Sequence, residues 1–175
     1  MTIQPLDRGG RDSLKEGDMR DGDPMARLLH YLELPPVWLA LFAGLAWLQA
    51  SVFPLAFLGR AGDVAGGLAL VFGLALSGWA ALRVVLAGTS LIPRERPDRL
   101  VVEGPYRLSR NPIYLADAAI LLGLILIWDA MPSLILVPVF LKLIEWRFIL
   151  REEALIRDAF GSEYDAYCAR VRRWI

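Results

Sequence analysis

Residues 37–58 read V-W-L-A-L-F-A-G-L-A-W-L-Q-A-S-V-F-P-L-A-F-L, a run without a single formally charged side chain. As a helix with a rise of about 1.5 Å per residue, this run would extend roughly 33 Å, which is enough to cross the hydrocarbon core of a bilayer. We therefore expect a membrane-spanning helix, with Pro54 introducing a kink near its end.

Three further apolar runs follow the first one. Residues 64–87 contain four glycines that would allow close packing against another helix, and Arg83 stands near their end. Residues 113–128 and 133–150 are shorter, and the turn at 129–132 joins them, so they are expected to form a hairpin of tilted or partly buried spans. The sequence predicts an all-α, polytopic membrane protein with about four transmembrane helices.

Four domains or segments are expected from these patterns. Residues 1–23 are polar and lack the apolar core of a signal peptide, so they should form a mobile tail. Residues 24–34 follow Asp23 as a helix that lies flat on the membrane. Residues 35–87 form an N-terminal helical pair, and residues 88–175 form the functional core.

Turn and capping residues mark three helix boundaries. Residues 59–62 contain two glycines and predict a tight turn, after which Asp63 can cap the second span. Asn111 can cap the third span. Beyond residue 150 the chain becomes charged and amphipathic, and Gly161-Ser162 predicts a break between two cytosolic helices, with Ser162 as the next N-cap.

Composition excludes several classes of function. The chain has 175 residues, is 56% hydrophobic and has a formal net charge of zero, so no general attraction to nucleic acid is expected. Cys168 and His30 are the only cysteine and histidine. They provide neither an internal disulfide nor the usual number of zinc ligands, so we expect no metal.

The distribution of basic residues predicts the topology. Bases are numerous before the first span, between the second and third spans, and after the fourth, whereas the first turn has only Arg60 and the hairpin turn has none. The positive-inside tendency then places both termini and the middle connection in the cytoplasm. The polar clusters around residues 100–114 and 151–153 therefore share one side of the membrane.

The first cluster contains the pattern G-P-Y-R-x-x-R-N-P-x-Y at residues 104–114. Two prolines restrict its backbone, and its guanidinium and aromatic groups could bind a polar, planar ligand or could serve only as lipid-headgroup contacts. Within the apolar runs, Lys142 can pair with Glu145, and Arg83 is one possible partner for Asp117.

The second cluster contains Glu152 and Glu153, which are adjacent and would project about 100° apart on a helix. They would either be solvated at the interface and paired with Arg151 or Arg157, or contact a cationic group of a ligand.

Taken together, these motifs resemble those of the isoprenylcysteine carboxyl methyltransferases and of the related phospholipid methyltransferases. The resemblance covers roughly residues 88–175. It is carried by four elements in order: the loop and helix start at 100–115, the acidic pair with Leu155, the pattern F-G-x-x-Y-x-x-Y at 160–167, and V-R-R-W at 171–174. The chain differs from the eukaryotic pattern at Asn111, where many members have histidine, and at Ala116, where glycine is common.

The resemblance implies an S-adenosylmethionine-dependent methyltransferase of a bacterial-type inner membrane, with its cofactor pocket on the cytosolic side. Its acceptor would be a membrane lipid or lipophilic small molecule. Arg110 and Glu152 would be the catalytic residues of the methyl transfer. Arg110 would orient an anionic acceptor or the cofactor carboxylate. The residues implied to bind the cofactor are Tyr106, Arg110, Asn111, Pro112, Tyr114, Leu115, Glu152 and Glu153.

Two other classes of function remain open at this point. Membrane reductases that use NADPH share a similar C-terminal architecture. Their phosphate-rich cofactor, however, would need more basic residues in its pocket. A non-catalytic membrane scaffold could retain the fold without turnover.

Overall fold

A computed structural model describes residues 34–55, 57–88 and 98–175, and every secondary-structure element in these ranges is helical. Residues 34–175 form one compact unit. The expected tail at 1–23 and nearly all of the expected surface helix at 24–34 lie outside the described residues. His30 lies outside them as well.

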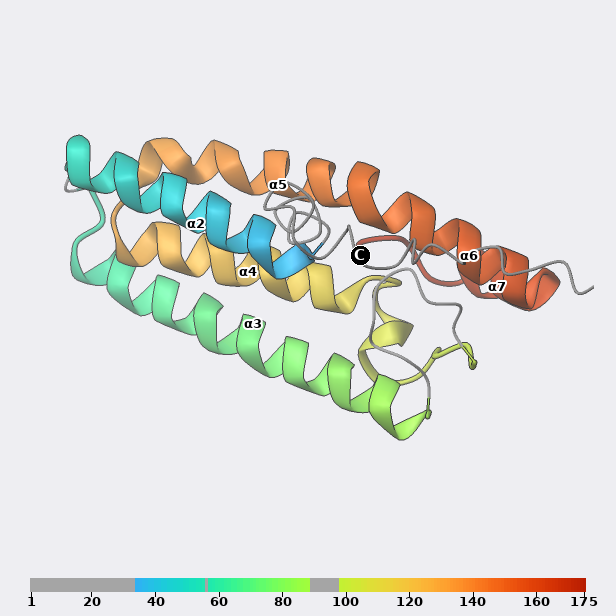
Figure 1. The fold of residues 1–175 in the computed structure, drawn as a ribbon. Coiled ribbons are helices and arrows are strands. Elements are labelled where there is room, and N and C mark those ends of the chain that lie inside the picture. Colours follow the sequence, from blue (N-terminus) through green and yellow to red (C-terminus); the bar gives the residue numbers. More distant parts are fainter. Residues whose placement is uncertain (1–33, 56, 89–97) are drawn as a thin grey trace, which may run out of the picture. The chain divides into compact units, whose positions relative to one another are not determined.

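Three long helices form most of the unit: α2 (Pro35–Val52), α3 (Arg60–Leu86) and α4 (Pro112–Ile127). The helix α4 packs against both α2 and α3 and also against α5 (Leu136–Ile144), so it lies at the centre of the bundle. Figure 1 shows α4 between the green α3 and the blue α2, with α5 along the opposite edge.

The lengths and surfaces of α2 and α3 are those of membrane helices. Both are long and apolar enough to cross a bilayer, whereas α4 is apolar but has only 16 residues. Large apolar side chains of α3 remain exposed, including Leu68, Phe72 and Trp79. Exposed apolar side chains in this number along one helix indicate contact with lipid or with another apolar partner.

The first two helices differ from expectation at their ends. The helix α2 ends at Val52, so Pro54 follows the helix and does not kink it. The helix α3 begins at Arg60, which makes most of the expected turn at 59–62 the first turn of the helix. Gly59 supplies the change of direction with a φ of +48°.

The turn before α3 is held by Asp129 and not by the expected cap Asp63. The Asp129 carboxylate accepts hydrogen bonds from the backbone N–H groups of Phe57 (2.8 Å), Leu58 (3.0 Å) and Gly59 (3.3 Å). Asp129 follows α4 in sequence, so this contact joins the turn before α3 to the turn after α4. The physical reason is that a carboxylate in a turn can accept several N–H groups that precede a helix.

We expect Asp129→Asn to lower the free energy of unfolding by about 1–2 kcal/mol, because one amide oxygen cannot replace a carboxylate that accepts three N–H groups. Asparagine tolerates the φ of +50° at this position, so the backbone itself should not be strained. Thermal unfolding in detergent measures the effect, and Asp63→Asn in the exposed first turn of α3 is the control. Equal melting temperatures for both variants would contradict this assignment.

Glycines allow α3 and α4 to approach closely. A Cβ atom placed on Gly66 would lie 2.6 Å from the backbone oxygen of Gly123, and one placed on Gly73 would lie 2.8 Å from the oxygen of Ala116. The expectation of close packing through glycines is confirmed at these two positions, whereas Gly67 and Gly78 have open space beside them.

The fourth apolar run is part of a longer helical rod. It begins with the 3₁₀ turn η2 (Met131–Ile135), continues through α5 and the π-helical turn η3 (Glu145–Ile149), and ends with α6 (Leu150–Phe160). The hairpin of the third and fourth runs is confirmed by the packing of α4 on α5. The helix does not end at Leu150, because the charged residues after it continue the same rod (Figure 1).

The predicted break between the last two helices is confirmed. Gly161 adopts a φ of +50° between α6 and α7 (Ser162–Cys168). Ser162 is the first helical residue and makes no capping bond, so its expected role as N-cap was wrong.

Candidate functional site

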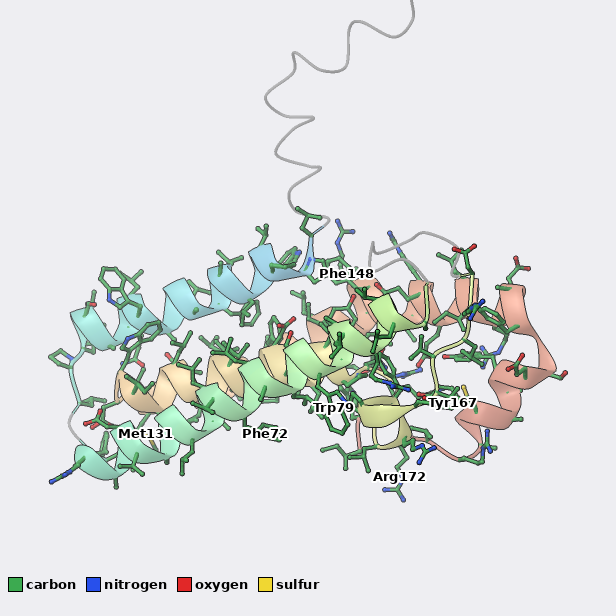
Figure 2. The ribbon with its side chains drawn as sticks, turned by 90° about the horizontal axis from the view of Figure 1, so that it is seen from below. Phe72, Trp79, Met131, Phe148, Tyr167 and Arg172 are labelled. Atoms are coloured by element: carbon green, nitrogen blue, oxygen red, sulfur yellow. The ribbon has the colours of Figure 1, made fainter. Side chains whose placement is uncertain are left out.

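The polar residues gather at the end of the bundle where α3 ends and α4 begins, which we call the site end. Figure 2 shows Trp79, Tyr167 and Arg172 at this end, whereas Met131 lies at the opposite one. The short 3₁₀ helix η1 (Gly104–Arg107) is held against α3 here. Arg83 forms an ion pair with Glu103 just before η1, so it does not pair with Asp117 as the sequence had suggested.

The loop between η1 and α4 is bound by the end of the chain. The Arg110 backbone N–H donates to the carbonyl of Arg172 (3.0 Å), while the Ser109 hydroxyl and the Asn111 amide both donate to the carbonyl of Arg173 (3.1 Å each). Asn111 occupies the N-cap position of α4 without making a capping bond, because its side chain is used in this contact.

A chain of alternating charges runs beside this loop. Arg110 contacts Glu153 (Nη2–Oε1, 3.3 Å), and Arg173 donates to both oxygens of Glu153 (3.0 and 2.7 Å) and to Glu145 (2.6 Å). The hydrogen bond to Glu153 raises the pKa of the Arg173 guanidinium. Glu153 is only 7% exposed, so the two guanidinium groups offset the cost of burying its charge.

The π-helical turn brings Glu145 and Glu153 to the same guanidinium. Two residues eight positions apart in a regular α-helix project about 80° apart. One π turn accommodates an additional residue, which reduces this angle to about 20°. The irregular turn η3 therefore aligns the two carboxylates on one face of the rod.

Glu152 faces a different helix from its neighbour. The Tyr114 hydroxyl of α4 donates to its carboxylate at 2.7 Å. Arg157, which the sequence offered as a partner, pairs instead with Asp165 (2.9 Å). The two adjacent carboxylates thus project in different directions, as expected, and both contact segments near the start of α4.

Tyrosines cover the side of the site formed by η1 and α7. The Tyr167 hydroxyl donates to the backbone oxygen of Tyr106 at 2.6 Å, and burial raises the pKa of Tyr167. Burial and, to a smaller extent, the negative charge of Glu152 raise the pKa of Tyr106 to about 12. Both phenols therefore remain neutral donors at physiological pH.

The structure brings the expected residues into one region. Tyr106, Arg110 and Asn111 come from η1 and the loop, Tyr114 and the buried Pro112 from the first turns of α4, and the acidic pair from α6. Leu115 is half-buried on the same part of α4. Side-chain contacts among them include the pairs Tyr114–Glu152 and Arg110–Glu153.

Sequence reasoning missed the residue that organises this region, Arg173. The only signal was its presence in the motif V-R-R-W, which indicates no partner by itself. Glu145 was correctly paired with Lys142 (3.3 Å), but its shorter contact with Arg173 was not expected.

Two guanidinium nitrogens at the site end have no hydrogen-bond partner within the described residues, the Nε of Arg83 and the Nε of Arg110. The Nε of Arg110 is buried and unbonded within the described part of the chain. An unpaired guanidinium N–H beside carboxylates is suited to a ligand that carries both an anionic and a cationic group.

Comparison with protein families gave a match to the central part of the chain. A family model described as phospholipid methyltransferase matches residues 62–163, which is more than half of the chain. The matched region runs from α3 to the start of α7 and includes η1, α4 and the acidic pair, whereas Arg173 lies beyond it. No match was found among curated proteins or among solved structures.

Proposed function

This chain belongs to the phospholipid methyltransferase family, and from that membership we propose that it is an integral membrane methyltransferase that uses S-adenosylmethionine. Its acceptor would be a membrane lipid or a lipophilic small molecule. The observation that carries the proposal is the contact between the basic loop and the acidic pair, made by Arg110 with Glu153.

The residues present fit the chemistry of S-adenosylmethionine. This cofactor carries an ammonium, a carboxylate and a sulfonium group. The buried, unbonded Nε of Arg110 could donate to the carboxylate, and Glu152 could accept from the ammonium while it keeps its bond to Tyr114. Tyr106, Asn111, Pro112 and Leu115 would surround the remainder of the molecule.

Glu153 supports this arrangement through Arg110 and Arg173. Both of its carboxylate oxygens are already bonded to Arg173, so its contribution is to hold the Arg110 guanidinium in place. A guanidinium that is already held in place loses less conformational entropy when the ligand binds than a mobile one would.

When bound, the cofactor supplies an electrophilic methyl group for direct displacement. The protein's part is to align donor and acceptor and to exclude water, and good alignment can lower a barrier by up to about 7–11 kcal/mol. The phenols of Tyr106 and Tyr114 are neutral and lie near Glu152. They can therefore pack around the ligand and donate hydrogen bonds without adding charge to the site.

The membrane arrangement forms part of the proposal. The helices α2 and α3 would cross the bilayer fully, and α4 together with residues 131–150 would form two shorter, tilted spans. Both termini and the site end would face the cytoplasm. Residues 88–175 would form the cofactor-binding core, supported by the helical pair at 35–87.

We expect Glu152→Gln to weaken S-adenosylmethionine binding by about tenfold, because the ammonium of the ligand would lose a charged acceptor. Isothermal titration of the purified protein in detergent measures the affinity. The melting temperature should change little, since the amide can still accept the Tyr114 hydroxyl.

Glu163→Gln on the exposed surface of α7 is the matched control. Wild-type protein that binds NADPH and not S-adenosylmethionine would refute the proposed function. Unchanged affinity in Glu152→Gln would refute the assignment of this residue. Cofactor binding without product from a broad panel of acceptors would instead favour a scaffold.

A further inference from the structure

The rod formed by α5, η3 and α6 runs along one edge of the bundle (Figure 1). The ring of Phe148 in η3 lies 6.4 Å from the ring of Tyr114 in the first turn of α4. The third apolar run therefore begins close to the level at which the fourth one ends. In the proposed membrane arrangement, this level is the bilayer surface at the site end. Trp146 is 72% exposed here, as is typical of tryptophans at a membrane surface.

Two arginines at this level have no acidic partner. Arg147 and Arg151 are four positions apart, close to one turn of helix, so they are neighbours on the surface of the rod. Within residues 34–55, 57–88 and 98–175, neither forms an ion pair or a side-chain hydrogen bond, whereas the nearby Lys142 is paired with Glu145. Like charges at this spacing repel each other, and an anion that contacts both guanidinium groups removes this repulsion.

A shallow groove adjoins the two arginines on the side away from the apolar run. It has a volume of about 450 Å³ and, among the described residues, is lined by Arg151, Ala154, Leu155 and Asp158 of α6. These residues follow Leu150, the last residue of the apolar run, so the groove would lie in the layer of lipid headgroups. Glu152 and Glu153 contact Tyr114 and Arg173 from other faces of α6, so the groove is separate from the proposed cofactor site.

We propose that Arg147 and Arg151 bind the phosphate of an anionic phospholipid in the leaflet at the site end, and that the groove accommodates the rest of its headgroup. Arginine suits this role because its planar guanidinium can donate two parallel hydrogen bonds to phosphate oxygens. The acyl chains would lie along the exposed Trp146 and Val139 of the same rod. This inference rests on the membrane arrangement of the proposed function, but the bound lipid is not the methyl acceptor.

The charges at the groove favour one class of headgroup. The two arginines and the carboxylate of Asp158 together leave one net positive charge. A headgroup with one negative charge neutralises it, whereas a zwitterionic headgroup brings no net charge. Asp158 can also accept hydrogen bonds from headgroup hydroxyls, and it would repel a second negative charge. A phosphoglycerol headgroup, with one charged phosphate and two hydroxyls, meets these requirements.

The test uses the purified full chain in nanodiscs that contain equal amounts of phosphatidylglycerol and phosphatidylcholine, with the retained lipid measured by native mass spectrometry. The wild type should retain phosphatidylglycerol in preference by about tenfold, the effect of one charge-assisted hydrogen bond. The double variant Arg147→Gln/Arg151→Gln should reduce this preference to near unity. The variant Arg147→Lys/Arg151→Lys should keep most of it, because both positive charges remain.

Arg60→Gln/Arg170→Gln is the matched control, because it removes two exposed arginines outside the proposed lipid site. This control should show the wild-type preference. Equal retention of both lipids by the wild type overturns the inference, as does an unchanged preference in Arg147→Gln/Arg151→Gln. An equal loss of preference in the control would show a general attraction between charges, and it also overturns the inference.

Cofactor affinity separates this inference from the proposed function. Arg147→Gln/Arg151→Gln should melt in detergent at nearly the wild-type temperature, because neither side chain has a partner in the described residues, and it should bind S-adenosylmethionine within about twofold of the wild type. A wild type that prefers phosphatidylglycerol but does not bind the cofactor would refute the proposed function and support the lipid site. A wild type that binds the cofactor without any lipid preference would do the reverse.

Discussion

Glu153→Gln is expected to lower the free energy of unfolding by about 3–5 kcal/mol, the usual cost of breaking a buried ion pair from one side. The carboxylate is 7% exposed and bonded to Arg173 through both oxygens. Once the charge of Glu153 is removed, the Arg110 guanidinium would remain buried and would lose the carboxylate with which it is paired. Arg173 would retain only Glu145.

The consequences of Glu153→Gln should reach the whole site. The loop around Asn111 is bonded to the backbone of Arg173, so movement of this arginine would release the loop as well. We expect a melting temperature at least about 6 °C below that of the wild type and no measurable cofactor binding. Glu163→Gln is exposed and should show neither effect. A wild-type melting temperature for Glu153→Gln would show that the charge chain does not stabilise the fold.

Gly66→Ala is expected to destabilise the bundle by about 3 kcal/mol, at the upper end of the range for overpacking. The added methyl group would lie 2.6 Å from the backbone oxygen of Gly123 and 2.9 Å from the backbone nitrogen of Ile127. Backbone atoms of a helix cannot rotate away as a side chain can. The helices α3 and α4 must therefore separate, which also weakens the contact at Gly73.

Gly67→Ala provides a matched control one position away. No atom lies within 4 Å of a Cβ atom placed on Gly67, and alanine favours a helix by about 1 kcal/mol over glycine. This variant should be as stable as the wild type or slightly more stable. Unfolding of both variants by increasing denaturant in mixed micelles measures the difference. Equal stability of the two variants would contradict the close packing of α3 on α4.

The existence and order of the helices could be predicted because they depend on local patterns. Apolar runs indicated the helices α2, α3 and α4, and the glycine at 161 indicated the last break. The true end of the rod could not be found from hydrophobicity, because the residues after Leu150 are polar but continue the same helix. The residue that holds the turn before α3 was also missed, because Asp129 is distant in sequence.

The candidate site was predictable only in part for the same reason. Loop residues and carboxylates could be selected by type and spacing, and the structure does bring Arg110 to Glu153. The role of Arg173 depends on the chain folding back over the loop, and the alignment of Glu145 with Glu153 depends on one π turn. Neither feature has a periodic signal in the sequence.

The most direct test of the account is an experimental structure of the full chain with S-adenosylhomocysteine, the product form of the proposed cofactor. We expect the ligand at the site end, with its carboxylate at the Arg110 Nε and its ammonium at Glu152. A ligand bound away from both residues, or a site end in which η1 and α6 lie too far apart to contact one molecule, would contradict the account.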